Sequence, residues 1–393
     1  MSFIDIDKTE NKNKIAIVVV GYNRLDSIRR LLKSILSAEY PNKDIPLVIS
    51  IDCSGNKKLY DYVENLKWPH GEKYINIQNE RLGLKRHIFQ CAGLSKYFKA
   101  VIVLEDDLFL SPSFYSYALS AVEKYRDDEK IAEIALYRND DNGYAGFPFE
   151  PLQNGADVFL WQDVCTSGEI ITERMWTQFM KWSEEKCDDN IINKADMPRQ
   201  IKGWGRAWSK PYNTYVVSTN KYIVYPHVAV STNFGEAGEH SETSTILTQV
   251  GLMYGNKQYE MPEVSKLVSY DLYTNNESLY EWLGYSREEL CLDIYGQGRG
   301  LNNRRYLLSP QKLPYKVLRS FGLTMRPIEI NIKYGIEGKG LFLYDTNLEL
   351  GNKRSNKYNF EFLRFFNHSI NTHHIWRYAM MTFKMALKRK LLK

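Results

Sequence analysis

Apolar runs of strand length alternate with segments of helical spacing along the first 125 residues. The run at 15–20 (IAIVVV) is continuous and mostly β-branched, which is typical of a strand buried on both faces of a parallel sheet. The segment 25–36 follows with leucine and isoleucine at helical spacing. The same alternation predicts further strands at 46–51, 74–78 and 100–104 and further helices at 58–66, 83–98 and 111–125. We therefore expect an α/β fold, with a mostly parallel sheet flanked by helices.

The pattern becomes less regular after residue 137. We expect an irregular segment at 137–163, a helix at 174–185, a polar loop at 186–203 and a strand at 222–230. Beyond about residue 255, short strand-like and helical stretches predict an additional C-terminal α+β region. The expected organisation has three parts: a main domain at 1–250, an accessory or acceptor-binding region at 251–360, and a basic amphipathic helical tail at 361–393.

Polar residues follow three of the predicted strands. Gly21, Tyr22, Asn23 and Arg24 come after the first strand, Asp52 ends the second, and Glu105, Asp106 and Asp107 end the fourth. Because the carboxyl ends of parallel strands meet at one edge of the sheet, these residues are expected to converge there. Ligands of such sheets bind at that edge.

The three acids are the strongest chemical signal. The apolar run at 101–104 leads directly into Glu105, Asp106 and Asp107. Adjacent carboxylates at the end of a packed strand are costly unless a cation neutralises them. A divalent ion such as Mg²⁺ or Mn²⁺ prefers oxygen ligands and often also holds phosphate oxygens. Asp107 is the residue we expect to ligate the metal directly. The alternative is an acidic strand end that is solvated in a loop.

Composition narrows the class of protein. The 393 residues, with 44% hydrophobic and 25% charged side chains, are ordinary for a globular protein with a large core. The five cysteines are scattered without a Cys-x-x-Cys pair, which indicates a reducing compartment and argues against a zinc site or a disulfide framework. The N-terminal residues are polar and resemble no signal peptide. We therefore expect a cytoplasmic protein.

The C-terminal tail is basic. Six lysines and arginines lie between 374 and 393 without a single acid, interleaved with apolar and aromatic residues. This composition is typical of an amphipathic helix at a membrane surface, here the inner face of the plasma membrane. The alternative is a terminal helix whose apolar stripe packs on its own domain.

Residues 14–245 resemble the GT-A glycosyltransferases, which use nucleotide-sugar donors and have a Rossmann-like domain. The opening strand with Gly21–Arg24 resembles the family's first nucleotide-binding strand and loop. Leu104–Asp107 resembles its Asp-x-Asp motif, in the Glu-Asp-Asp form of N-acetylglucosaminyltransferase I. The segments at 166–168 (TSG), 204–208 (WGRAW), 225–226 (YP) and 233–240 are similar to bacterial surface-polysaccharide glycosyltransferases.

The resemblance implies roles for the residues at the sheet edge. The donor nucleotide is expected at Gly21, Tyr22, Asn23, Arg24, Asp52, Lys85, Glu105 and Asp106. The cation would lie on the diphosphate and stabilise the leaving group as a Lewis acid. His240 follows a glycine-rich turn and is a second candidate metal ligand. Each role has a plain alternative: Asp52 as a turn-forming residue, and Arg24 and Lys85 as solvated residues at helix starts.

The sequence gives fewer signals for the residues that would bind and deprotonate the acceptor. An inverting transferase needs a carboxylate that deprotonates the acceptor hydroxyl. The N-acetylglucosaminyltransferase I pattern has an acidic pair between two tryptophans, but the segment 204–208 contains no acid. Glu169 is the preferred candidate base, followed by Asp163, Glu236 and Glu239. Trp204 and Trp208 are expected either to stack on an acceptor sugar or to belong to the core.

The sequence thus predicts a metal-dependent hexosyl- or N-acetylhexosaminyltransferase. The expected donor is a nucleotide-diphosphate sugar, and the expected acceptor is a glycan or a lipid-linked oligosaccharide in bacterial surface-polysaccharide synthesis. Two other functions stay open. A sugar-nucleotidyltransferase would carry a glycine-rich phosphate loop with a basic residue, which 21–24 is not. A non-catalytic relative that binds glycan or nucleotide would explain the missing acid at 204–208.

Overall fold

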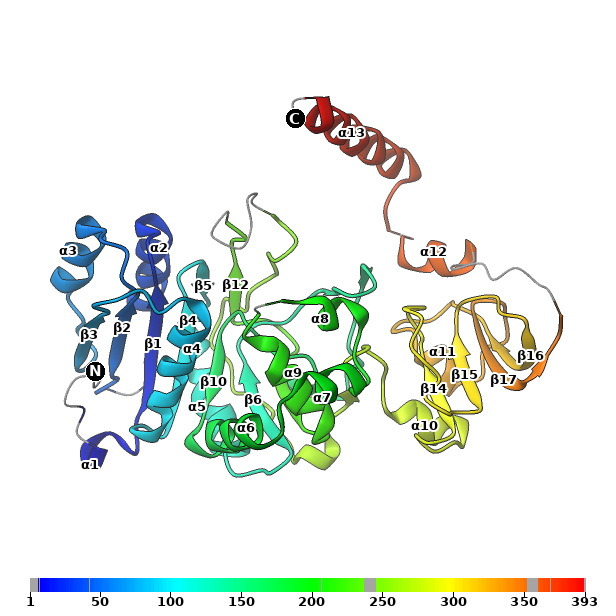
Figure 1. Ribbon diagram of the computed structural model, residues 1–393, viewed down its shortest axis with the longest axis horizontal. Coiled ribbons are helices and arrows are strands. Elements are labelled where there is room, and N and C mark those ends of the chain that lie inside the picture. Colours follow the sequence, from blue (N-terminus) through cyan, green and yellow to red (C-terminus); the bar gives the residue numbers. More distant parts are fainter. Residues whose placement is uncertain are drawn as a thin grey trace. The chain divides into compact units, whose positions relative to one another are not determined.

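The computed structural model describes residues 6, 8–41, 43–205, 207–236, 245–351, 360–367 and 369–391. The chain divides into two compact units (Figure 1). Unit 1 comprises 1–144 and 151–277, and unit 2 comprises 145–150 and 278–393. Unit 1 extends past the boundary expected near residue 250, because the strand β13 (Ser269–Tyr270) joins its sheet beside β9.

Unit 1 is built on a nine-stranded sheet with the order β13-β9-β11-β6-β10-β4-β1-β2-β3. Its other strands are β1 (Ile15–Gly21), β2 (Leu47–Ile51), β3 (Lys73–Ile77), β4 (Ala100–Glu105), β6 (Ile131–Ala135), β9 (Val158–Trp161), β10 (Glu169–Ile171) and β11 (Tyr222–Pro226). The first four are mutually parallel, with β1 between β2 and β4. Every residue of β1 is buried, as its continuous apolar run requires. The predicted α/β class and mostly parallel sheet are confirmed.

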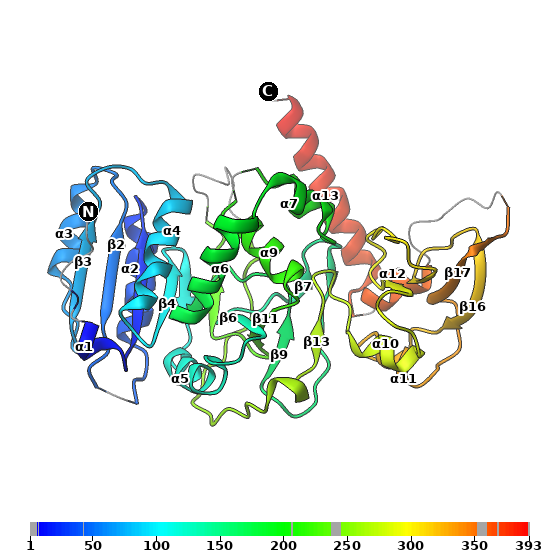
Figure 2. The same cartoon turned by 60° about the horizontal axis from the view of Figure 1, so that its bottom comes forward.

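Helices connect and cover these strands (Figure 2). The helices of unit 1 are α1 (Lys8–Asn11), α2 (Leu25–Leu36), α3 (Lys57–Asn65), α4 (Leu84–Ala92), α5 (Phe114–Tyr125), α6 (Glu173–Lys186), α7 (Asp189–Lys194), α8 (Arg199–Gly203) and α9 (Ser209–Ser218). Aromatic rings join α4, α6 and α9: Phe89 lies 5.2 Å from Trp176, and Phe179 lies 4.5 Å from Tyr212. These contacts fix the three helices as one layer over the sheet.

The prediction was wrong in two places. The polar stretch at 186–203, expected as a loop, contains the short helices α7 and α8. Asp188 begins α7 by accepting a hydrogen bond from the N–H of Ile191, so a capping residue rather than apolar periodicity marks this helix. The segment at 137–163, expected to be irregular, contributes the interior strand β9, which is only four residues long.

Unit 2 has its own core. Its four-stranded sheet has the order β14-β15-β17-β16, made from β14 (Leu290–Leu292), β15 (Tyr306–Ser309), β16 (Tyr315–Phe321) and β17 (Leu341–Glu349). The helices are α10 (Ser278–Leu283), α11 (Ile330–Lys333), α12 (Phe360–Phe366) and α13 (Thr372–Leu391). Phe362, Phe365 and Phe366 of α12 pack into the apolar core of this unit. In contrast, the side chains described in α13, at 372–387, are exposed except for the half-buried Ile375.

Candidate active site

The carboxyl end of β1 supplies the first wall of the site. Gly21 pairs with Ile51 of β2, and Arg24 stands at the N-cap of α2. A Cβ atom at Gly21 would lie 2.8 Å from Cδ1 of Ile28, which is closer than real contacts allow. Glycine therefore lets the chain leave the strand against the first turns of α2. Asn23 is held in the next turn, because the Asn56 side-chain amide donates to its Oδ1 at 2.9 Å.

Arg24 is paired with two of the three acids. Its Nη2 donates to Oδ1 of Asp106 and to Oδ2 of Asp107, the latter at 3.2 Å. The Asp106 side chain is only 7% exposed and the Asp107 side chain 17% exposed, whereas the Arg24 side chain is 30% exposed. One guanidinium therefore faces three adjacent carboxyl groups. The described contacts of this cluster leave an excess of negative charge.

Burial and the excess of negative charge raise the pKa values of two of these acids. Burial, reinforced by Asp107 and Asp106, raises the pKa of Glu105 to about 8. Burial also raises the pKa of Asp106 to about 6, although Arg24 acts in the opposite direction. Burial lowers the pKa of Arg24, but the two aspartates more than offset it and raise the value overall. Near neutral pH, a bound cation would thus displace protons from this cluster.

A segment from β12 (Ser231–Asn233) closes over Asp107. The Asn233 amide Nδ2 donates to Oδ1 of Asp107 at 3.3 Å, and the N–H of Phe234 donates to the Asp107 carbonyl at 3.0 Å. Gly235 has a φ of +58°, and a Cβ atom there would lie 2.3 Å from the Thr245 carbonyl oxygen. Only glycine fits this tight turn. These contacts join residues more than 120 positions apart in the sequence at one place.

Glu236 continues this segment onto α2. It accepts a hydrogen bond from the Ser27 hydroxyl, and its Oε2 lies 2.7 Å from Nη2 of Arg30. The Arg30 guanidinium also stacks on the Phe234 ring, 3.7 Å from its centroid. The hydrogen bond from Arg30 is the largest cause of a lowered pKa at Glu236. Glu236 is therefore held as a carboxylate that already has a cationic partner.

Asp52, at the carboxyl end of β2, organises the start of α4. Its Oδ1 accepts from the N–H groups of Cys53 and Leu82 at 2.9 and 2.8 Å, and its Oδ2 accepts from the N–H of Gly83 at 2.9 Å. The turn-forming role considered for Asp52 is thus present. Because a carboxylate offers about four acceptor positions, Oδ2 keeps capacity for one more donor. Contact with a base or ribose stays a prediction.

Two further predicted donor-site residues lie beside this turn. Tyr22 is half-buried, and the Arg81 guanidinium stacks 4.9 Å from its ring centroid. Lys85 is exposed in the first turn of α4, with its Nζ 5.6 Å from the centroid of the Phe89 ring. The structure therefore brings every predicted donor-site residue to the carboxyl ends of β1, β2 and β4 or to the start of α4. Their contact with a nucleotide stays a prediction.

The preferred candidate base, Glu169, lies inside the sheet rather than at its edge. Glu169 begins β10 inside the sheet, paired with Val103 on one side and Ala135 on the other, and is 2% exposed. Its Oε1 has no hydrogen-bond partner among the described residues. Burial, and then the nearby Glu133, raise its pKa well above the usual value. A protonated side chain within the sheet does not suit a base, so the prediction for Glu169 gains no support.

The tryptophans pack against protein. Trp208 is 5% exposed at the N-cap of α9. Trp204 is half-buried against the small apolar cluster that contains Met197 and Ile201. Stacking on an acceptor sugar stays a prediction for both. His240, the second candidate metal ligand, lies outside the described residues, as does Glu239.

The chemistry of the acids fits a hard divalent cation, but only in part. Within the ranges that the structure describes, no three His, Cys, Asp or Glu side chains are arranged to hold a metal ion. Asp107 nevertheless presents two carboxylate oxygens at the sheet edge, and Glu105 is partly exposed beside it. Mg²⁺ commonly binds through one or two carboxylates, with waters and substrate phosphates completing its coordination. The residues thus fit a cation that is bound jointly with a phosphate ligand.

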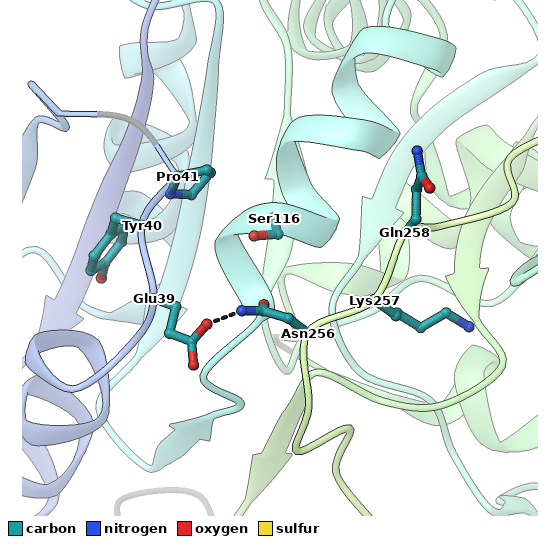
Figure 3. A pocket seen from close by; sticks show the side chains of 7 residues that line it. All are labelled: Glu39, Tyr40, Pro41, Ser116, Asn256, Lys257 and Gln258. Carbon is teal, nitrogen blue, oxygen red and sulfur yellow. Dashed lines mark hydrogen bonds between the residues drawn. The ribbon is translucent and has the colours of Figure 1, made fainter.

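A separate cavity of about 450 Å³ is not part of this site (Figure 3). It is lined by Glu39, Tyr40, Pro41, Ser116, Asn256, Lys257 and Gln258. Glu39 accepts a hydrogen bond from the Asn256 side-chain amide, which already uses part of the polar lining. The segment 39–41 follows the C-terminal end of α2, one helix length of about 18 Å from Arg24.

Several residues of the site could not have been chosen from sequence. Arg81 stacks on Tyr22, and Arg30 neutralises Glu236, although no motif marks either arginine. Asn233 belongs to the segment 233–240 that the sequence does single out, but its contact with Asp107, 126 positions away, could not be predicted from it. Such pairs depend on how loops from distant segments fold together. A periodic pattern carries no information about them.

Replacing Arg24 with alanine should destabilise the protein at alkaline pH more than at acidic pH. Asp106 is ionised only above its pKa of about 6, so the attraction to Arg24 is present at pH 8 and lost at pH 5. We expect a loss of about 2 kcal/mol at pH 8, below the range for fully buried pairs because Arg24 is partly exposed. Thermal unfolding at both pH values measures this. Arg29→Ala, which removes an exposed pair with Asp26, is the control; equal losses at both pH values for Arg24→Ala would contradict the account.

The chain is similar to known sequences over its N-terminal part. Residues 2–191 match the model of the GNT-I family. An alpha-1,3-mannosyl-glycoprotein 2-beta-N-acetylglucosaminyltransferase from Arabidopsis thaliana is 25% identical over 238 residues, which cover 57% of this chain and 47% of that protein. The chain thus spans about half the length of this relative.

The solved structures that resemble the chain do so with low TM-scores. S. aureus TarS 1-349 in complex with UDP-GlcNAc has a TM-score of 0.36 at 15% identity, covering 59% of this chain and 62% of that one. The mannosyltransferase PcManGT from Pyrobaculum calidifontis has a TM-score of 0.33 at 11% identity, covering 57% and 59%. The motifs that follow β1, β2 and β4 lie within residues 2–191, the segment that matches the GNT-I family model.

Proposed function

We propose that the protein is a glycosyltransferase that moves a sugar from a nucleotide-diphosphate donor to a glycan or lipid-linked acceptor. The observation that carries the proposal is the convergence of Arg24, Asp52 and the acids Glu105–Asp107 at one sheet edge, within the GNT-I family segment. A donor diphosphate is an anion and needs cationic partners. Arg24 and a cation held at Asp107 supply them without further rearrangement of the fold.

The positions of the residues suggest a role for each of them in the proposed reaction. A cation at this edge would stabilise the charge that develops on the leaving diphosphate. Asp107 would hold the cation, and Arg24 would contact the diphosphate once the acids are neutralised. Asp52 and Tyr22 would contact the base and ribose. Glu105 and Asp106 would contact the ribose, the donor sugar or water beside the cation. The name of the Arabidopsis relative specifies the transfer of N-acetylglucosamine. UDP-GlcNAc is therefore the first donor to test.

We also propose a class of acceptor and a cellular location for the protein. The motifs at 166–168, 204–208 and 233–240 are similar to bacterial surface-polysaccharide enzymes, which supports a glycan or lipid-linked acceptor in that synthesis. A lipid-linked acceptor is held at a membrane surface. We therefore propose a cytoplasmic protein with peripheral membrane contact.

The C-terminal helix α13 has features that suit the proposed membrane contact. In its described part, α13 contains Arg377 and Lys384 at a spacing that places them on one side of the helix, and no acid. Trp376 and Phe383 are 64% and 62% exposed on another side. Among the described helices, none combines the length and apolar composition needed to cross a bilayer. A basic helix with exposed aromatic side chains suits binding to an anionic membrane surface.

Nucleotide binding should depend on both Mn²⁺ and Asp107. UDP should bind at least about 10-fold more tightly with Mn²⁺ than without, because the acids repel an uncompensated diphosphate. Asp107→Ala should remove this Mn²⁺ effect together with UDP release from UDP-GlcNAc. Isothermal calorimetry and a UDP-release assay measure the two quantities. Asp26→Ala, which removes an exposed acid in the first turn of α2, is the control. An unchanged Mn²⁺ effect in Asp107→Ala would contradict the metal role.

The affinity for UDP with Mn²⁺ should rise with pH between about 6 and 8. The pKa values of Asp106 and Glu105, about 6 and about 8, are raised, so these groups carry protons that cation binding must release. Calorimetry in buffers of different ionisation enthalpy should show proton release that shrinks toward pH 8. Glu105→Gln should flatten the upper part of this dependence. A pH-independent affinity with no proton release would count against it.

Removal of the tail should weaken membrane binding. We expect the full chain, but not a chain truncated before Met380, to co-sediment with vesicles that contain phosphatidylglycerol. Reversing Arg377, Lys384 and Lys388 to glutamate should lower binding roughly 100-fold, at about 1 kcal/mol for each basic residue. Phosphatidylcholine vesicles are the control. Equal binding of the full and truncated chains would exclude this role of the tail.

A further inference from the structure

Unit 2 contains a cavity that shares no residue with the candidate active site. Its volume is about 610 Å³, which lies within the usual range for small-molecule sites. Three segments of unit 2 form its wall: the residues after β16, the turn before β17 and the helix α12. None of them belongs to residues 2–191, which match the GNT-I family model. The family match therefore gives no role to this cavity.

Backbone contacts fix the shape of two parts of the wall. A Cβ atom at Gly338 would lie 2.3 Å from Cα of Gly322, so the turn before β17 touches the segment after β16 at these two glycines. The buried Asn331 side chain holds the rest of that segment. Its Oδ1 accepts from the N–H groups of Thr324 and Met325, each at 2.9 Å. The wall is therefore preformed, which lowers the entropic cost of binding a ligand.

Arg326 forms a further part of the wall, and its charge already has a partner. Its Nη1 donates to Oε1 of Glu150 at 3.0 Å, and its Nη2 donates to the Phe365 carbonyl. The guanidinium also stacks 4.4 Å from the centroid of the Phe365 ring, which packs in the apolar core of the unit. Arg326 is therefore an anchored and neutralised element of the cavity.

Three other charged side chains line the cavity without a protein partner. Glu337, Glu361 and Arg364 are exposed, and no ion pair or side-chain hydrogen bond joins any of them to another described residue. Glu361 and Arg364 are three positions apart on α12, a spacing at which ion pairs often form. Their hydrogen-bonding positions are therefore open to a ligand in the cavity.

The mixture of charges indicates which ligand would suit this cavity. An anion such as phosphate would face the carboxylates of Glu337 and Glu361, and a cation would face Arg364. A neutral ligand with several hydroxyl groups satisfies both signs of charge. Its hydroxyls donate to the carboxylates, and its oxygen atoms accept from the guanidinium. Hydrogen bonds to charged groups are stronger than those between neutral groups. Neutral sugars carry such hydroxyls around every ring.

We propose that this cavity binds a neutral sugar unit of a glycan, and that the glycan is the acceptor rests on the proposed glycosyltransferase function. Glu337 and Glu361 accept from hydroxyls of the sugar, and Arg364 donates to its oxygen atoms. A glycan held on unit 2 stays at a high local concentration around the enzyme, so a released end is recaptured without a new encounter. Unit 2 thus contributes to retention of the acceptor and takes no part in the chemical step.

Titration of the full-length chain with neutral tetrasaccharides, in the absence of UDP and Mn²⁺, tests the proposal. The probes are tetrasaccharides of glucose, galactose, mannose or N-acetylglucosamine, and saturation-transfer NMR measures their binding. At least one should bind with a Kd of about 1 mM or below. Arg364→Ala and Glu361→Gln should each weaken that binding about 10-fold, because each removes a charge-assisted hydrogen bond. Neither should lower the Tm, since both side chains are exposed and unpaired.

Glu281→Gln is the matched control, because it removes an exposed carboxylate of α10 that does not line the cavity; its affinity for the sugar should be unchanged. A tetrasaccharide of galacturonic acid, which is negatively charged, should bind more weakly than the galactose probe. Absence of binding by every neutral probe, tighter binding of the acidic one, or unchanged affinity in Arg364→Ala and Glu361→Gln would overturn the proposal.

The binding of UDP with Mn²⁺ is measured separately on the same proteins. Its Kd should be the same in Arg364→Ala, Glu361→Gln and the unsubstituted chain, because these residues belong to unit 2 and the donor-site residues to unit 1. An unsubstituted chain that binds the neutral sugar but not UDP would remove the proposed glycosyltransferase function and leave the sugar site in place. The reverse result would remove the sugar site alone.

Discussion

The charge balance at the end of β4 is the constraint on which the site depends. The strand β4, buried up to Leu104, delivers Glu105, Asp106 and Asp107 to the sheet edge, and only Arg24 opposes them among the described ion pairs. Burial raises the pKa values of Glu105 and Asp106 because the fold supplies too little positive charge for three carboxylates. A buried cluster of this kind is costly for stability alone. Its presence is understandable if a ligand brings the missing charge.

The surrounding elements hold this cluster in place rather than neutralise it. Gly21 lets the chain turn closely from β1 into α2, which carries Arg24 at its N-cap. Asp52 fixes the start of α4 through three backbone N–H groups. From the far side, Asn233 and Glu236 attach the segment after β12 to Asp107 and to α2. Contacts from β1, β2, α4 and the segment after β12 thus meet around the acids.

Sequence reasoning worked where local physics decides the outcome. The β-branched run at 15–20 and the spacing at 25–36 gave β1 and α2 to within a residue, because burial and amphipathic periodicity act locally. The acids at 105–107 were identifiable because a charged strand end is unusual in itself. In contrast, the three-residue strand β10 has too little pattern to detect, so the sequence gives no sign that Glu169 lies inside the sheet. The pairing of Arg30 with Glu236 depends on tertiary contacts that no local pattern encodes.

The central claim is that a cation and a nucleoside diphosphate together neutralise the acids after β4. Crystals of the protein grown with Mn²⁺ and UDP, measured at the manganese absorption edge, test it most directly. The account predicts an anomalous peak within coordination distance of Asp107 and of the UDP phosphate oxygens, with the Arg24 guanidinium moved from Asp107 toward the diphosphate. A peak elsewhere, or UDP bound with Arg24 still paired to both aspartates and no metal beside them, would contradict it.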